Sequence, residues 1–549
     1  MPELTTARTL RAGTILRRGT QRAYRRLAFG PGEPHLRRLD LAPDREGSDR
    51  PAGTARSLLH LLHLTDLQLV DAQSPARIEF LDRVRDREDI RHLIPAHRAH
   101  ETLAVHAFEA LVRTARALRS AGAPLDLAVS TGDAIDNQQW NELQWFHSVM
   151  EGGRVTPDSG GPRYEGVQAA EWRDPEYWHP DPMPDAYKER WGFPDYPGLL
   201  EEAVRPFVSE GLGLPWLSCF GNHEGLVQGT AIPTISVQDL VVGDRKPIDL
   251  PRGFDPVANV DAFVPTPEAF LSGPSRRVTA DPDRRFLSRR DFVEAHLRIP
   301  GRPAGHGFTS ENIDLGTAYY VHDGFPAVRL VVLDTTNPGG FYEGSVGATQ
   351  LAWLEERLVE VHARFFDRDG SPVETGASDR LVVLFSHHGL ETMTNPTSFA
   401  NPLEPGGADL PRALADEVER LLHRFANVVL WVNGHTHENR IRPRPDPDGK
   451  TPGFWDVTTC AVMDWPSQAR LVRVEDNGNG TLSILCTMID HDGSPDPSRA
   501  EGLWRLASTH RELAANHPHR GSDSDVSGEP TDRNAELLLP LPFGSDTAS

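Results

Sequence analysis

The chain has 549 residues, with 57 Lys and Arg against 79 Asp and Glu, so its formal net charge is −22. This charge argues against binding to nucleic acids and anionic membrane surfaces, which are themselves negative. Three scattered cysteines argue against a disulfide framework and against a Cys-x-x-Cys zinc site. No apolar run reaches the roughly 18 residues that span a bilayer. We therefore expect a soluble, cytoplasmic protein with a small-molecule substrate.

The two ends of the chain differ in composition from its middle. Residues 1–56 are rich in Arg and weakly periodic, and we interpret them as an N-terminal extension. Residues 57–500 carry the regular strand and helix patterns of one main domain. Residues 501–549 form a C-terminal segment, and from about Gly521 they are rich in Ser, Asp, Pro and Gly apart from the apolar run 537–543. This composition predicts a disordered tail.

The main domain begins with a strand, a helix and a second strand. Residues 57–64 form an apolar run of the length of a buried strand. Residues 97–119 repeat apolar side chains every three or four positions, which indicates one face of an amphipathic helix. Residues 125–130 then read as another buried strand. This order is typical of a mainly parallel sheet with helices packed on it.

Two long segments, 151–213 and 226–312, interrupt this order. They are rich in Pro, Gly, Asp and Trp, and we interpret them as loop insertions that mostly pack against the domain itself. Strand patterns resume later, and helical patterns lie between some of them at 350–365 and 411–425. The later strands are predicted at 318–321, 328–333, 381–385, 428–432, 454–459, 469–474 and 482–487. The last of these have no helices between them, so we expect mixed sheets.

Five polar blocks each begin where a predicted strand ends. They are Thr65-Asp66-Leu67-Gln68, Thr131-Gly132-Asp133-Ala134-Ile135-Asp136-Asn137, Phe220-Gly221-Asn222-His223-Glu224, Phe385-Ser386-His387-His388-Gly389 and Asn433-Gly434-His435-Thr436-His437. The carboxyl ends of neighbouring strands are where α/β proteins assemble their sites. Asp and Asn supply oxygen ligands and neutral imidazole supplies nitrogen, so these blocks indicate a site for two divalent or trivalent cations.

The order and spacing of these blocks resemble the motifs of the calcineurin-like metallophosphoesterases. The resemblance covers residues 59–490 apart from the insertions. It implies a four-layer α/β/β/α sandwich with two mixed β-sheets. It also implies a phosphoesterase that hydrolyses a small phosphodiester or phosphomonoester with a hydroxide that bridges two metal ions.

The resemblance assigns a role to each matching residue. Asp66, Gln68 and His437 would bind the first metal, Asp133 would bridge both, and Asn222, His387 and His435 would bind the second. His223 would be the catalytic residue, which protonates the leaving oxygen or stabilises charge on the phosphoryl group.

Three positions depart from the family pattern or leave alternatives open. Gln68 stands where the family has His; either its carbonyl oxygen binds the metal, which favours Mn or Fe over Zn, or the side chain turns away. Asp136 stands where the purple acid phosphatase branch has a metal-binding Tyr, so we expect it to orient a ligand rather than to bind metal. His387 directly follows its strand, and we favour it over His388 as the ligand.

Two other functions remain open for this sequence. A protein that has lost catalysis could keep the fold as a binding scaffold, and Gln68 is the feature that favours this alternative. A nuclease of the same superfamily is disfavoured by the net charge of −22. We interpret Asp464, in the segment Asp464-Trp465-Pro466, as a structural loop anchor. The natural substrate, the identity of the metals and the oligomeric state are not determined by the sequence.

Overall fold

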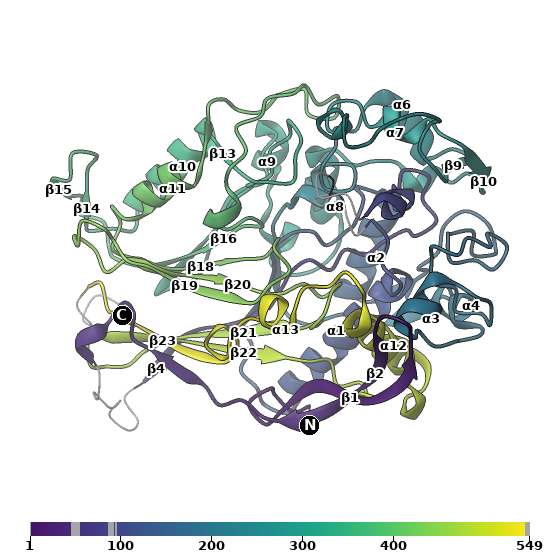
Figure 1. Cartoon of the computed structure of the whole chain (residues 1–549). Coiled ribbons are helices and arrows are strands. Elements are labelled where there is room, and N and C mark those ends of the chain that lie inside the picture. Colours follow the sequence, from purple (N-terminus) through teal and green to yellow (C-terminus); the bar gives the residue numbers. More distant parts are fainter. Residues whose placement is uncertain (1, 46–54, 86–89, 91–92, 94–95, 544–549) are drawn as a thin grey trace.

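The structure is a computed structural model that describes residues 2–45, 55–85, 90, 93 and 96–543. Two large β-sheets pack face to face, and helices cover the outer face of each (Figure 1). The layers therefore follow the order α/β/β/α, and both sheets are mixed, as the sequence predicted. Among the described residues, no helix is both long enough and apolar enough to cross a bilayer.

The first sheet has six strands in the order β11-β12-β16-β18-β20-β19. They are β11 (Tyr320–Phe325), β12 (Val328–Val332), β16 (Leu381–Phe385), β18 (Val428–Asn433), β19 (Arg440–Arg444) and β20 (Phe454–Thr458). The four inner strands are parallel. α10 (Ala348–Val359) lies in the crossover from β12 to β16 and α11 (Ala415–Leu422) in that from β16 to β18, whereas β19 lies between β18 and β20. Alternate residues of β12 face opposite sides: Leu330 enters the core between the sheets and Val331 packs with the outer helices.

The second sheet has seven strands in the order β3-β23-β22-β21-β4-β5-β8. They are β3 (Leu36–Arg38), β4 (Arg56–Leu64), β5 (Leu127–Ser130), β8 (Trp216–Ser218), β21 (Ala469–Asp476), β22 (Thr481–Ile489) and β23 (Ala535–Pro540). β4, β5 and β8 are parallel, whereas β21, β22 and β23 pair antiparallel. The helices α1 (Ala104–Ser120), α2 (Trp140–Glu151) and α12 (Gly502–Asn516) lie together on this side of the molecule.

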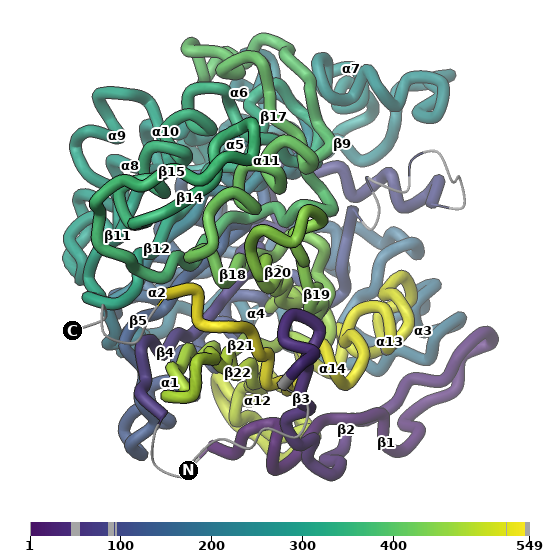
Figure 2. Tube along the Cα trace, turned by 90° about the vertical axis from the view of Figure 1, so that its left-hand side faces the viewer, coloured from purple at the N-terminus to yellow at the C-terminus, as the bar shows by residue number. Residues whose placement is uncertain are grey.

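Both ends of the chain are integrated into this architecture. The hairpin of β1 (Arg8–Arg18) and β2 (Ala23–Pro31) contacts α12, and β3 pairs with β23. Figure 2 shows these purple N-terminal strands beside the yellow C-terminal elements. The predicted disordered tail is therefore wrong up to residue 543, since 521–543 form α13 (Asp523–Val526), α14 (Pro530–Arg533) and β23. Residues 46–54 of the predicted extension and 544–549 of the predicted tail lie outside the described residues.

The reason for this difference lies in β23 itself. Leu537 and Leu539 are buried in the core between the sheets, so a run of a few apolar residues outweighs the polar composition around it. A composition average over the tail hides such a short strand.

The two segments interpreted as insertions contribute short elements and no strand to either large sheet. They contain α3 (Ala186–Trp191), α4 (Leu199–Ala203), α6 (Ile235–Val241), α7 (Glu268–Leu271), α8 (Arg289–Arg298), β6 (Gly153–Val155), β7 (Phe207–Ser209), β9 (Arg245–Pro247) and β10 (Ser275–Arg277), and α9 (Ser310–Leu315) begins at the end of the second. Four further short strands, β13 (Val346–Gly347), β14 (Arg364–Phe366), β15 (Pro372–Glu374) and β17 (Arg412–Ala413), and the short helix α5 (Asn222–Gly225) complete the fold.

A cluster of buried imidazoles makes the fold sensitive to acid. The ring of His147 lies 4.6 Å from that of His296, and His306 stacks on Trp216 at 3.6 Å between ring centroids. Burial lowers the pKa of His296 to about 3 and that of His306 to about 4, and it holds the pKa of His147 well below its usual 6.5. Below pH 6.5 the unfolded chain therefore binds protons that the folded chain does not.

We expect stability to be fully present above pH 6.5 and to be lost as the pH falls below it. The loss at pH 5 is about 2 kcal/mol for each such imidazole. His147→Phe should remove the contribution of one imidazole to this loss of unfolding free energy. The substitution breaks no hydrogen bond, because neither ring nitrogen of His147 has a hydrogen-bond partner among the described residues. Urea unfolding of both proteins between pH 7.5 and 5 measures the difference. If the free energy of unfolding fell equally with pH in the parent protein and in His147→Phe, the prediction would be contradicted.

Candidate metal centre

The residues that the sequence predicts as metal ligands come together at one edge of the two sheets. Asp66 and Gln68 follow β4, Asp133 follows β5, Asn222 follows β8, His387 follows β16, and His435 and His437 follow β18. Within each sheet these strands are parallel neighbours, so their carboxyl ends lie at the same edge. Each sheet supplies part of the site.

Carboxylate oxygens from one sheet meet imidazole nitrogens from the other. Asp66 Oδ1 lies 3.2 Å from His437 Nε2, and Asp133 Oδ2 lies 3.0 Å from His387 Nε2. His387 Nε2 is also 3.2 Å from His435 Nδ1. One ligand atom from each of Asp66, Asp133 and His387 falls within 4.8 Å of the others. Ligand atoms this close to one another could hold a metal ion between them.

Three oxygen atoms of the predicted ligands are buried without a hydrogen-bond partner among the described residues. They are Asp66 Oδ1, Gln68 Oε1 and Asn222 Oδ1. The 3.2 Å approach of His437 to Asp66 Oδ1 does not have hydrogen-bond geometry. Because a buried, unpaired acceptor is costly, these atoms fit direct coordination of hard cations. Carboxylate, amide and imidazole together form the donor set of such a site.

The backbone at the site is held in an unusual conformation. Five predicted ligand residues have positive φ: Asp66 (50°), Gln68 (40°), Asp133 (50°), His435 (72°) and His437 (58°). Residues other than glycine rarely adopt this left-handed region, and such strain gathers at functional sites. The surrounding structure therefore holds these side chains in place at a conformational cost.

The second oxygen of each aspartate is fixed by donors from the protein. Asp66 Oδ2 accepts hydrogen bonds from Thr65 Oγ1 at 2.7 Å and from the backbone N–H of His435 at 2.9 Å. Asp133 Oδ1 accepts the backbone N–H of His223 at 2.9 Å. These contacts orient each carboxylate so that its other oxygen faces the site.

The charges of the two sheets stabilise each other. Burial opposes the charged carboxylate of Asp66, but the charges of His437 and His387 outweigh it, so the pKa of Asp66 lies below its usual range. Burial likewise opposes the imidazolium forms, yet Asp133 and Asp66 raise the pKa of His387 to about 9, and Asp66 and Asp464 raise the pKa of His437 to about 10. Cations that bind here must displace these protons, so metal affinity should rise with pH.

Glu224 holds the loops around Asp133 in place. Its carboxylate accepts the backbone N–H groups of Gly221, Asp133 and Ala134, each at 2.7 Å. Burial and the nearby charge of Asp133 raise the pKa of Glu224 to about 8. The sequence places Glu224 within the Gly-Asn-His-Glu block, but its role as a backbone clamp is visible only in the structure.

Asp464 does more than anchor a loop. Its Oδ2 lies 2.7 Å from His437 Nδ1, and its Oδ1 accepts a hydrogen bond from Arg98 Nε at 2.9 Å. A carboxylate on the far nitrogen of a ligating histidine fixes the ring and increases its basicity. The interpretation of Asp464 as a structural anchor alone was therefore incomplete.

We expect Asp464→Asn to weaken metal binding by about 10- to 100-fold. The amide can still accept from Arg98, but it loses the charge that supports His437. Titration of the metal-free protein with Mn²⁺ measures the affinity, and Asp448→Asn, at a carboxylate whose side chain is 69% exposed, is the matched control. An affinity equal to that of the control would show that Asp464 does not support a ligand.

His223 and Gln68 lie side by side at the rim of the site. Gln68 Nε2 is 3.2 Å from His223 Nε2, and His223 Nδ1 bonds to the backbone carbonyl of Asp136. The carboxylate of Asp136 instead accepts from Arg77 at 2.6 Å. The orienting contact expected from Asp136 thus comes from its main chain, and it acts on His223 rather than on a predicted metal ligand.

The two adjacent histidines after β16 have different surroundings. His387 directs Nε2 toward Asp133 and bonds through Nδ1 to the carbonyl of Thr131 at 3.0 Å. Both nitrogens of His388 are engaged elsewhere, by Thr335 Oγ1 at 2.8 Å and by the carbonyl of Tyr342 at 2.9 Å. His388 lies close enough to His387 and His435 to form a second candidate group, but its contacts favour His387 as the ligand.

No family model matches the chain, and no curated protein matches it. Solved structures to which the chain is similar include a dimetal phosphatase from Danio rerio, at 12% identity and a TM-score of 0.34, over 79% of this chain and 100% of that one. A purple acid phosphatase from yellow lupin matches at 9% identity and a TM-score of 0.30, over 84% of this chain and 53% of that one. PhoD matches at 11% identity and a TM-score of 0.30, over 84% of this chain and 70% of that one.

Proposed function

We propose that this protein is a metal-dependent phosphoesterase of the calcineurin-like type, which hydrolyses a small phosphomonoester or phosphodiester. The observation that carries the proposal is the convergence of buried oxygens on Asp66, Gln68 and Asn222, which have no hydrogen-bond partner among the described residues, with imidazoles from the other sheet. Such a cluster fits cations and has no evident structural purpose without them.

The proposed ligand sets follow from these positions. Asp66, Gln68 and His437 would hold one ion, Asn222, His387 and His435 the other, and Asp133 both. Bound cations would activate water and neutralise charge on the phosphoryl group. The oxygen of Gln68 in place of an imidazole favours Mn or Fe over Zn at the first position.

A small polar pocket lies beside the site and supports a small substrate. Its volume is about 140 Å³, and its lining includes Gln68, His223, Arg98 and Asp136. Pockets for drug-sized ligands are larger, at roughly 300–1,000 Å³. The pocket therefore suits a phosphoryl group with a compact leaving group.

His223 is the residue we propose for proton transfer. Its Nδ1 contacts the backbone carbonyl of Asp136. The other ring nitrogen, Nε2, therefore lies toward Gln68, which also lines the pocket. The contact to a carbonyl fixes Nδ1 as a donor. In the neutral ring Nε2 accepts from the amide of Gln68. Only the doubly protonated ring carries a proton on Nε2, and we propose that this form gives that proton to the oxygen of a departing alcohol.

Turnover of model substrates tests the proposal. Metal-free protein is loaded with Mn²⁺, Fe²⁺ or Zn²⁺ and assayed with p-nitrophenyl phosphate and bis-p-nitrophenyl phosphate. We expect Mn²⁺- or Fe²⁺-dependent hydrolysis of at least one ester. If no metal gives turnover above that of Asp133→Asn while Mn²⁺ still binds, the protein is instead a metal-binding scaffold that has lost catalysis.

A further inference from the structure

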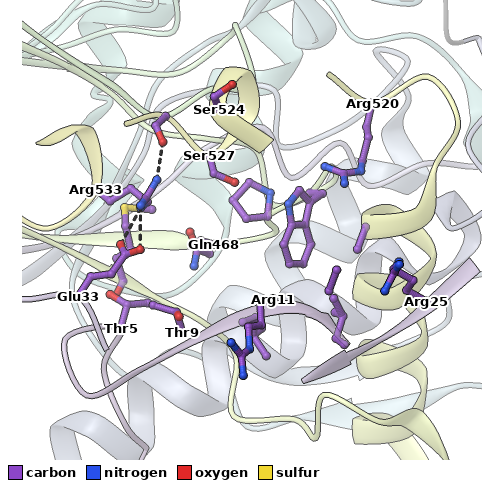
Figure 3. A pocket seen from close by; sticks show the side chains of 18 of the residues that line it. Thr5, Thr9, Arg11, Arg25, Glu33, Gln468, Arg520, Ser524, Ser527 and Arg533 are labelled. Atoms are coloured by element: carbon purple, nitrogen blue, oxygen red, sulfur yellow. Dashed lines mark hydrogen bonds and ion pairs between the residues drawn. The ribbon is translucent and has the colours of Figure 1, made fainter. Parts of the chain in front are cut away.

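The pocket beside the candidate metal centre is separate from a larger cavity at the N-terminal hairpin. That cavity, of about 610 Å³, lies between the hairpin and α12, and Figure 3 shows its wall with the ion pair of Arg533 and Glu33. The described residues that line it have none in common with those that line the pocket of about 140 Å³ at His223. The space around His223 is therefore set by the walls of the smaller pocket.

One of these walls is a tight turn, residues 227–230. The N–H of Thr230 donates to the carbonyl of Val227 at 3.1 Å, and Gln228 and Gly229 between them have φ values of 48° and 64°. Two successive positive φ values are the pattern of a type I′ turn, in which glycine is usual at the second central position. Gln228 and Thr230 line the pocket. The turn therefore places Gly229 between two residues of the pocket wall.

Hydrogen bonds fix the turn to the loops on both sides of it. The N–H of Gln228 donates to Asn137 Oδ1 at 2.8 Å, and Gln228 Nε2 donates to Asp136 Oδ2 at 3.1 Å. On the other side, the N–H of Phe341 donates to the carbonyl of Thr230 at 2.8 Å. The backbone of the turn is thus held in one position relative to the residues of the site.

Gly229 sets the orientation of Asn222. Its carbonyl accepts a hydrogen bond from Asn222 Nδ2 at 2.9 Å, whereas Asn222 Oδ1 is buried with no hydrogen-bond partner among the described residues. A carbonyl accepts but cannot donate, so it bonds the nitrogen end of the amide. The oxygen end is left for a cation, as the proposed role of Asn222 requires.

The missing side chain of Gly229 leaves space for the ring of His223. A Cβ on Gly229 would lie 2.4 Å from Cδ2 and Nε2 of His223 and 2.6 Å from Nδ2 of Asn222. Non-bonded carbon atoms pack at about 3.5–4.0 Å, so a methyl group here would displace its neighbours by about 1 Å. The ring and the amide are ends of side chains, which yield more easily than the bonded backbone of the turn. Gly229→Ala should therefore disturb the site more than the fold.

We propose that the turn 227–230 is a positioning element of the site. Through Gly229 it fixes the amide of Asn222 for metal binding and holds the ring of His223 in place for proton transfer. Gly229 acts through these two side chains and is thus a positioning residue, and its effect on His223 rests on the proposed phosphoesterase function.

Metal affinity tests the hold on Asn222 without any hydrolysis. Calorimetric titration of metal-free Gly229→Ala with Mn²⁺ should give an affinity about 10- to 100-fold weaker than that of the parent protein, as for loss of a contact that orients a ligand. The matched control is Gly449→Ala, at φ 65°, where a Cβ would meet no atom of the described residues within 4 Å apart from its chain neighbours. Both variants carry the same backbone strain, so their unfolding midpoints should fall equally. Equal Mn²⁺ affinities would overturn the role of Gly229 at Asn222.

Hydrolysis at saturating Mn²⁺ tests the hold on His223. Gly229→Ala should lower kcat for alkyl esters by about 10²-fold, the cost of a misplacement of about 1 Å, and much less for p-nitrophenyl esters, which leave without a proton. In a His223→Asn background the same substitution should change kcat for alkyl esters by less than about threefold, because the displaced ring is gone. Gly449→Ala should lower neither rate. Equal losses for both esters, or losses that add fully to that of His223→Asn, would overturn the role of Gly229 at His223.

A second variant tests the turn without an added methyl group. Asn137→Ala removes the acceptor of the Gln228 N–H and leaves Gly229 intact, whereas Asn137→Asp retains that acceptor. Mn²⁺ affinity should fall severalfold in Asn137→Ala and return toward the parent value in Asn137→Asp. If Asn137→Ala binds Mn²⁺ as tightly as the parent protein, the turn does not position Asn222. A parent protein that hydrolyses no ester would refute the proposed function, and the Mn²⁺ affinities would still decide the role of Gly229.

Discussion

Asp133→Asn is expected to lower kcat/KM for phosphate esters by about 10³-fold or more. A loss of about 10²–10³ follows removal of one donor to a transition state, and Asp133 is proposed to bind both ions. The substitution keeps the shape of the side chain. Its amide oxygen can still accept the N–H of His223, which bonds to Oδ1 at 2.9 Å, so the fold should remain.

Steady-state assays and metal analysis of the same sample measure this loss. The variant should retain less than the full two ions per chain, and its unfolding midpoint should stay within a few degrees of the parent protein. Asp448→Asn again serves as the control for a charge removed from the surface. Full turnover with Asp133→Asn would exclude the proposed bridging role.

His223→Asn is expected to lower kcat by about 10²- to 10⁴-fold for esters of alkyl alcohols, the usual range for loss of a general acid. The loss should be much smaller for p-nitrophenyl esters, since p-nitrophenolate leaves without a proton. Metal content should not change, because His223 Nδ1 is committed to a backbone carbonyl and its Nε2 to Gln68.

The comparison of leaving groups separates proton transfer from positioning. A variant that only misplaces the substrate would lose activity equally with both kinds of ester. His322→Asn, at a partly exposed imidazole on β11, is the matched control. Equal losses for both esters would assign His223 to binding and would leave the source of the proton elsewhere.

Several elements could be predicted from the sequence because their signal is local. The strand at 381–385 has the same bounds in the structure as β16, and the strands at 428–432 and 454–459 differ from β18 and β20 by one residue. The first two are continuous apolar runs, which are typical of a strand buried on both faces, and the third is an apolar run interrupted by Asp456. The helix predicted at 97–119 begins later, at Ala104, since boundaries depend on contacts outside the helix.

Elements that depend on distant partners were missed. β23 lies in a segment whose composition predicted a tail, yet its Leu537 lies in the core. The helix α12, before that tail, packs on α1, and the sequence patterns did not predict it. β23 pairs with β3 near the start of the chain and with β22. Propensity and composition do not carry that information.

The sequence by itself determined the chemistry of the candidate site: aspartate, amide and imidazole groups placed after strands in a fixed order, with Gln68 in one position. Only the tertiary structure decided which atoms meet. It bonded both nitrogens of His388 to Thr335 and Tyr342, set Asp464 behind His437, and placed Arg77 rather than a metal ligand against Asp136. The reason is physical, because residue types follow from local sequence, whereas these contacts join segments 27 to 59 positions apart that meet only when the strands are paired.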